Sequence, residues 1–301
     1  MPVLGRQSTP EPGVSPYVRA ARGLAGLFPV CANPCCRSGW LHLWRGRQTP
    51  AFEGGWTCSP ECMRERIRCA AMRELDGRDE MPSNHSHRVP LGLVLLSQGA
   101  ISREQLKSAL ALQRGSHADR LGQVLMDHYG LGEPRITRAL SAQWNCPILS
   151  PEHHSPQTMA PLVPRLFLDA FRILPLRVAR SRIFYIAFED RIDRCVALGL
   201  ERMTGFEVEA GVMDGAAFRG AHSRMLASSF PPTRLVEVAG VDALIATLTR
   251  VLEDCKPAEA RLVRFHDYFW MRMWKDASFR SPSLPRRQAV EDVLCSIEEF
   301  R

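Results

Sequence analysis

An internal repeat with an offset of thirty residues is the feature that most restricts how this chain can fold. Eight positions of the segment 90–113 return in the segment 120–143 in a single register. The matched pairs are Leu91 and Leu121, Gly92 and Gly122, Val94 and Val124, Leu95 and Leu125, Leu106 and Ile136, Ala109 and Ala139, Leu110 and Leu140, and Gln113 and Gln143. Self-similarity at a fixed period indicates a duplicated structural unit, here two helices joined by a glycine-containing turn.

Local signals place the second helix of each copy. Ser102 and Gln105 have the spacing of a capping box, which predicts a helix that begins near Arg103. In the second copy Pro134 suits the first turn of a helix, where its missing N–H costs nothing. The residues expected on the buried face of the first of these helices are Leu106, Ala109 and Leu110.

The remaining periodicity predicts a mixed fold. Two β-favouring runs, Ile173–Val178 and Ile183–Phe188, are separated by a short turn, which predicts a hairpin. Further predicted elements are a helix over 192–203 that ends before Gly205, a strand over 206–212, helices over 63–75, 216–226, 241–253 and 290–300, and one or two strands within 261–274. The predicted fold class is α+β, with an N-terminal zinc knuckle, a tandem helical-hairpin repeat and then a small α/β sandwich unit.

The length of 301 residues leaves room for two or three domains. The predicted division is a flexible leader over 1–26, a zinc knuckle plus helix over 27–75, a linker over 76–88, the helical repeat over 89–150, the α/β subdomain over 151–226, and a C-terminal extension over 227–301 to which we assign no role.

Two close groups of cysteines predict a structural zinc site. Of the ten cysteines, five lie between positions 31 and 62, in two groups about twenty residues apart. Paired thiolates at two chain turns supply the four tetrahedral ligands that zinc prefers. The predicted ligands are Cys31, Cys36, Cys58 and Cys62, with Cys35 as the alternative to Cys36. We expect four aromatic residues, Trp40, Trp44, Phe52 and Trp56, to pack around this site.

Charge and hydropathy argue against two classes of partner. The formal net charge is +7, but nearly all of the positive charge is arginine spread along the chain, so a nucleic-acid partner is not expected. No apolar run reaches the length of a membrane helix, so membrane insertion is not expected and the predicted location is the cytoplasm.

Both copies of the repeat carry the pattern R-L-G-x-x-L, Gly, L-x-x-A-L-x-x-Q in whole or in part. This pattern resembles the N-terminal regulatory domain of type II secretion and type IV pilus assembly ATPases, also called the MshEN or general secretion pathway E N-terminal domain. Three later motifs extend the resemblance over residues 88–226: Leu162-Val163-Pro164, Leu174-Pro175-Leu176 and Met203-Thr204-Gly205.

The resemblance implies a ligand and a partner. Some members of that family bind cyclic di-GMP through the doubled motif, and the partner that the resemblance implies for this chain is a secretion or pilus assembly component. Carried over position by position, the implied ligand residues are Leu91, Gly92, Leu95, Gly99, Arg120, Leu121, Gly122, Leu125 and Gly130. Two departures are visible: Pro90 replaces the first motif arginine, and Gly130 falls one residue late. Arg88 or Arg114 is a candidate to compensate for Pro90.

The resemblance does not bring ATPase activity with it. A P-loop requires a lysine between glycine and Ser or Thr, whereas the three lysines of this chain follow Leu106, Cys255 and Trp274. We therefore expect a non-enzymatic regulatory protein, either a cyclic-di-GMP receptor or a docking module. The alternatives are a zinc-containing interaction scaffold without a nucleotide ligand and a nucleic-acid-binding regulator.

Overall fold

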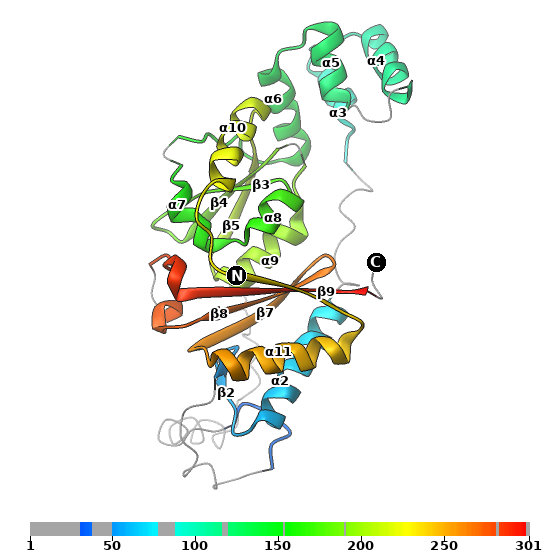
Figure 1. Cartoon of the computed structure of the whole chain (residues 1–301). Helices are drawn as coiled ribbons and strands as arrows, with labels where there is room; N and C mark the ends of the chain where they lie inside the picture. Colours follow the sequence, from blue (N-terminus) through cyan, green and yellow to red (C-terminus); the bar gives the residue numbers. More distant parts are fainter. Residues whose placement is uncertain are drawn as a thin grey trace, which may run out of the picture.

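The computed structural model describes residues 31–37, 50–77, 88–115, 120–152, 154–189, 191–280 and 283–298. The predicted leader, Trp40, Trp44 and most of the predicted linker lie outside this range. The described chain is α+β, as predicted, with helices and three small sheets (Figure 1). Within it, no helix combines the length and the apolar character needed to cross a membrane.

Four helices form one end of the molecule: α3 (Leu91–Ser97), α4 (Arg103–Gly115), α5 (Leu121–Tyr129) and α6 (Glu133–Trp144) (Figure 1). The capping box is present, because the Ser102 N–H donates to Gln105 Oε1 at 2.8 Å and the Gln105 N–H donates to Ser102 Oγ at 3.2 Å. Pro134 lies in the first turn of α6, as predicted. The prediction for Leu110 is wrong: its side chain is 38% exposed, since no element covers that flank of α4 in the described chain.

A small α/β unit follows α6. Its helices are α7 (Pro156–Met159), η2 (Ala160–Leu162), α8 (Arg165–Ala170), α9 (Arg194–Thr204) and α10 (Gly215–Leu226), and its strands are β3 (Ile173–Val178), β4 (Ile183–Phe188) and β5 (Glu207–Val212). The sheet order is β3-β4-β5, with β3 antiparallel and β5 parallel to β4. The hairpin prediction is confirmed, and Gly205 ends α9 with a φ of 72° that favours glycine.

The C-terminal segment forms a second sheet. It contains β6 (Thr233–Val238), α11 (Val241–Cys255), β7 (Glu259–Phe265), β8 (Tyr268–Trp274), the short helices η3 (Ala277–Arg280) and η4 (Arg287–Ala289), and β9 (Val290–Ile297). The strand order is β6-β9-β8-β7. The predicted helix over 290–300 is therefore wrong, because this segment is a central strand between β6 and β8.

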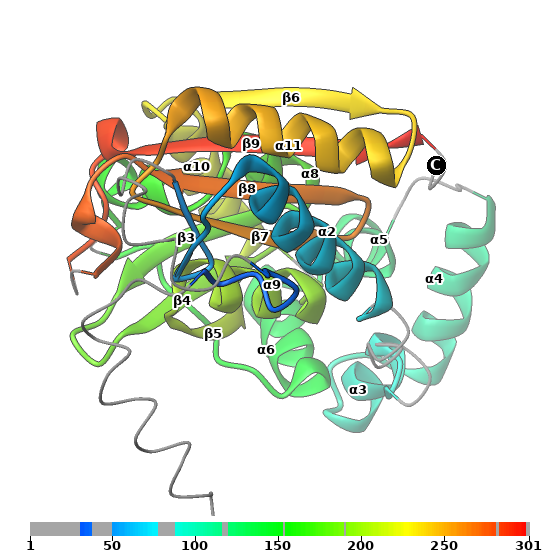
Figure 2. The ribbon, with the colours of Figure 1, turned by 90° about the horizontal axis from the view of Figure 1, so that it is seen from below.

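The N-terminal part of the described chain packs on this second sheet. It consists of the hairpin strands β1 (Ala51–Phe52) and β2 (Gly55–Trp56) and the helix α2 (Pro60–Asp76), which begins three residues before the predicted start. Helices α2 and α11 lie side by side on one face of the sheet (Figure 2). Phe52 belongs to the core between these helices and the sheet, so the prediction that it packs around the cysteines is wrong.

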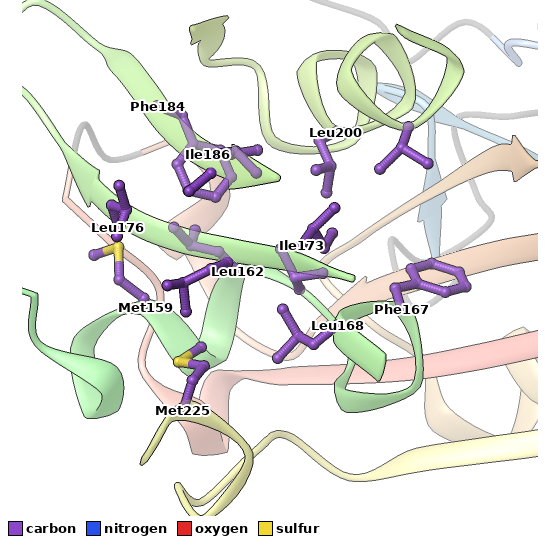
Figure 3. Close-up of a cluster of buried hydrophobic side chains, with 14 of the residues drawn as sticks. Met159, Leu162, Phe167, Leu168, Ile173, Leu176, Phe184, Ile186, Leu200 and Met225 are labelled. Carbon is purple, nitrogen blue, oxygen red and sulfur yellow. The ribbon is translucent and has the colours of Figure 1, made fainter. Parts of the chain in front are cut away.

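The other face of the second sheet shares a core with the α/β unit. Phe167 of α8 stacks on Phe265 of β7 with ring centroids 4.7 Å apart, and Trp270 of β8 meets Phe167 edge-on at 5.5 Å. Figure 3 shows Phe167 with the aliphatic side chains of the α/β unit that continue this core, among them Leu162 and Leu168. The two sheets are therefore joined through one hydrophobic core. Helices α2 and α11 cover the opposite face of the second sheet.

Candidate functional site

A cleft of about 310 Å³ lies where the four-helix end meets the α/β unit. The helical side contributes Leu91, Gln113, Arg120, Leu121, Gly122, Gln123, Met126, Glu133, Ile136, Thr137 and Leu140, and the α/β unit contributes Glu189, Met213, Gly215 and Arg219. Its volume falls at the lower end of the range for small-molecule pockets, and it combines an apolar floor with a few charged groups, as such pockets do.

Four of the nine predicted ligand residues line this cleft: Leu91, Arg120, Leu121 and Gly122. Leu91 comes from the first copy of the motif and the other three from the second, so both copies reach the same cleft. Leu95 and Leu125 do not line it, because their side chains are fully buried in the core of the helical end.

The paired glycines Gly92 and Gly122 permit close helix packing. A Cβ atom on Gly92 would lie 2.5 Å from Leu106 Cδ1, and one on Gly122 would lie 3.2 Å from Ile136 Cγ2. Each glycine thus faces the residue fourteen positions later, in the second helix of its own copy. Both are buried, and only Gly122 also borders the cleft.

Gly99 and Gly130 serve a different purpose. Their φ angles are +66° and +63°, in the left-handed region that favours glycine, and nothing lies within 4 Å of a Cβ built on either one. Each ends the first helix of its copy and turns the chain toward the second. Neither residue lines the cleft.

The departure at Pro90 changes the first copy. Pro90 stands directly before α3, where the second copy has Arg120. Arg88, one candidate to compensate, stacks over the Trp144 ring at 3.6 Å from its centroid, and Gln143 Nε2 donates to the carbonyl of Val89 at 2.8 Å. These contacts tie the entry of α3 to the end of α6. Neither Arg88 nor Arg114 lines the cleft.

The α/β unit supplies charged groups that the sequence pattern did not indicate. Glu189 pairs with Arg172 at 3.0 Å and with Arg219 at 3.6 Å, and Arg219 reaches the cleft from α10. The carboxylate of Glu133 accepts a hydrogen bond from the N–H of Ala216 at 3.1 Å. Only tertiary folding brings these residues together, so no local sequence motif predicts that they meet. Gln113 also lines the cleft, and the match between the two copies of the repeat had singled it out.

A second site lies at the other end of the molecule. The sulfur atoms of Cys31, Cys36, Cys58 and Cys62 all lie within 4.8 Å of one another. The Sγ atoms of Cys36 and Cys58 are 3.5 Å apart, and those of Cys58 and Cys62 are 3.6 Å apart. Four thiolates around zinc, with Zn–S bonds of about 2.3 Å in a tetrahedron, would be separated by about 3.8 Å. The donor set and its spacing therefore fit a tetrahedral thiolate site.

Local structure explains how four distant thiols meet. The Cys36 N–H donates to the carbonyl of Asn33 at 3.0 Å, which turns the first segment back on itself. Ser59 caps α2 by accepting from the Cys62 N–H at 3.2 Å, which sets Cys62 in the first helical turn. Arg66 of α2 then donates to the carbonyls of Ala32 and Phe52, both at 2.9 Å, and so fastens the first segment to the helix.

Two thiols of the group have raised pKa values. Burial, followed by hydrogen bonds with the neighbouring thiols, raises the pKa of Cys58 to about 12, and burial also raises the pKa of Cys31. A metal ion bound here would displace the protons of these thiols and stabilise the thiolates that coordinate it. Among the predicted aromatic residues, Trp56 packs against this group.

His266 and Asp193 form a histidine–carboxylate pair of the kind that occurs in catalytic sites. His266, in the turn between β7 and β8, lies 2.7 Å from Asp193, which caps α9. This hydrogen bond raises the pKa of His266. Burial opposes ionisation of Asp193, but the hydrogen bond and charge of His266, together with the N–H groups of Val196 and Cys195, keep the pKa of that carboxyl below its usual value. Cys195 and His266 line one cavity, yet burial and the nearby Asp193 charge raise the pKa of Cys195, which is the opposite of the shift that activates a nucleophilic thiol.

No family model and no curated protein matches this chain. Solved structures do match it. A structure of MshE with cdg is 23% identical, with a TM-score of 0.39, over 46% of this chain and 99% of that chain. Two crystal forms of the XpsE N-terminal domain are 16% and 18% identical, with TM-scores of 0.35 and 0.26, over 46% of this chain and 98% and 99% of theirs. The chain is similar to MshE and to the XpsE N-terminal domain.

Proposed function

We propose that this chain is a non-enzymatic binding module that takes cyclic di-GMP in the cleft between its helical end and its α/β unit. The observation that carries the proposal is the convergence of both motif copies on one cleft, through Leu91 from the first copy and Arg120 to Gly122 from the second. The resemblance of these motifs to the secretion-ATPase regulatory domain supplies the class of ligand.

The chemistry of the cleft suits a dinucleotide. Arg120 and Arg219 provide guanidinium groups on opposite walls, which pair with phosphate oxygens or with the N7 and O6 acceptors of guanine. Leu91, Leu121 and Met213 provide apolar surface against which a base packs. Because Pro90 supplies no charge, we expect the two guanine bases to make unequal contacts.

Calorimetric titration of the purified chain with cyclic di-GMP tests the proposal. The chain should bind, and Arg120→Ala should abolish the heat or weaken binding by about tenfold or more, since it removes a charge-assisted contact. Arg138→Ala is the matched control, because Arg138 is exposed on α6 and does not line the cleft. No heat with the wild-type chain, or equal losses in both variants, would refute a cyclic-di-GMP site.

A docking role is the second candidate, and exposed apolar side chains favour it. Leu93 of α3 is 49% exposed, and Leu110 and Leu112 of α4 are exposed as well. Leu140 is the residue of the second copy that corresponds to Leu110, and it packs against the α/β unit. The corresponding flank of α4 is uncovered in the described chain, and a secretion or pilus assembly component is the partner that the motif resemblance suggests.

We further propose that the four-cysteine group holds a structural zinc ion. Cys31, Cys36, Cys58 and Cys62 would be its ligands, and the ion would fasten the segment 31–37 to the start of α2. All four coordination positions would be filled by the protein, so the ion would have no open position for catalysis.

A further inference from the structure

Glu133 makes a contact that crosses the cleft. It is the first residue of α6, and its carboxylate accepts the hydrogen bond from the Ala216 N–H in the first turn of α10. Amides in the first turn of a helix have no partner within that helix, so Glu133 satisfies a group that would otherwise face solvent. Asp214, which precedes α10, makes no side-chain capping hydrogen bond.

The charge of Glu133 is well placed for this contact. A carboxylate is stabilised at the N-terminus of a helix, where the backbone N–H groups carry partial positive charge. The guanidinium of Arg219 meets the same spot, because a Cβ atom built on Gly215 would lie 2.9 Å both from Arg219 Nη1 and from Glu133 Oε1. The absence of a side chain at Gly215 is what leaves space for both groups.

The other end of α6 is fixed differently. After Trp144 the chain turns at Asn145, whose φ is 48°, and then joins the α/β unit. There the Val212 N–H donates to the carbonyl of Pro147 at 3.0 Å, and the Leu149 N–H donates to the carbonyl of Val212 at 2.8 Å. Helix α6 is therefore held on the α/β unit near its C-terminal end by Leu140, Trp144 and the continuous chain, and Glu133 adds a contact at its N-terminal end.

We infer that Glu133 is an autoinhibitory latch, which closes the helical end onto the α/β unit and which an anionic ligand must release to occupy the cleft. The inference rests on the proposed function for the identity of the ligand. Glu133 both fills part of the cleft and adds a negative charge beside Arg219, so it opposes a dinucleotide in volume and in charge.

Amide hydrogen exchange tests the latch without any ligand. In the full chain, Glu133→Ala should speed exchange of peptides that cover Gly215–Phe218 by about tenfold, the factor that corresponds to losing about 1.4 kcal/mol of protection. Glu104→Ala is the control, because Glu104 also lies in the first turn of its helix but is exposed and does not line the cleft. Unchanged exchange at the start of α10 in Glu133→Ala would overturn the latch.

Calorimetry with cyclic di-GMP then tests the autoinhibition. Glu133→Ala should bind about tenfold more tightly than the wild-type chain, since the ligand no longer displaces a charge-assisted hydrogen bond. Binding that is weaker or equal in this variant would show that Glu133 does not oppose the ligand and would overturn the inference. If neither protein binds, the proposed ligand and its inhibition by Glu133 both fail, while the exchange result still decides whether the contact is a latch.

Discussion

Cys35 and Cys36 are neighbours in the sequence, yet the backbone turn separates their roles. Only Cys36 brings its sulfur into the group with Cys31, Cys58 and Cys62, while Cys35 is exposed. The spacing of the cysteines was sufficient to predict two pairs of neighbouring thiols, because each pair lies on one local turn. The choice between Cys35 and Cys36 follows from the geometry of the turn at Asn33, which composition alone does not determine.

This difference gives a matched pair of variants. The chain produced with ample zinc should carry about one ion, and Cys35→Ser should retain it, whereas Cys36→Ser should lose most of it because three thiolates bind zinc far less tightly than four. Elemental analysis of the purified proteins by mass spectrometry measures the difference. Equal zinc content in the two variants would contradict the assignment of Cys36 as a ligand.

At the scale of elements, Gly92 allows α3 to pack closely on α4, the second helix of the same copy. A methyl group there would lie 2.5 Å from Leu106 Cδ1, so Gly92→Ala should lower the free energy of unfolding by about 1–3 kcal/mol through overpacking. Gly115→Ala is the control, since nothing lies within 4 Å of a Cβ at that position, and it should change stability by less than about 1 kcal/mol. Urea unfolding of both variants measures this, and equal losses would exclude the packing role.

Among the elements, β9 is the one whose sequence pattern predicted the wrong secondary structure. Val290, Val293, Leu294 and Ile297 have helical spacing, yet β9 is a strand with both faces buried, so it shows no alternation of apolar and polar residues. Its acidic residues are paired instead of exposed: Asp292 binds Arg272, and Glu291 binds Arg234 and Lys275. Strands β3 and β4 were predictable because a turn separates two short β-favouring runs.

At the scale of the whole molecule, a buried ion pair of the second sheet also connects that sheet to the α/β unit, through a hydrogen bond from Arg272. Arg272 is 1% exposed and donates two hydrogen bonds of 2.8 Å to the fully buried Asp292. A third bond, of 2.7 Å, reaches the carbonyl of Leu162 at the end of η2. The partners lie up to 110 residues apart in the sequence, so only the folded chain reveals that they meet.

Removing one member of this pair should be costly. Asp292→Ala leaves the Arg272 charge buried without its counter-ion, and it should lower the free energy of unfolding by about 3–5 kcal/mol. Arg234→Ala, which breaks a partly exposed pair with Glu291, should cost about 1 kcal/mol or less. Denaturant unfolding followed by tryptophan fluorescence measures both, and similar costs for the two variants would contradict the coupling.

The position of β9 has a consequence for how the protein is made. It is the last strand described, yet it lies between β6 and β8. During synthesis the cysteine segment and α2 leave the ribosome early, while the platform on which α2 rests is incomplete until residue 297 has emerged. The four-helix end, built from contacts close in sequence, can fold long before that moment. Translation therefore completes the helical wall of the cleft before it completes the sheet on which α2 rests.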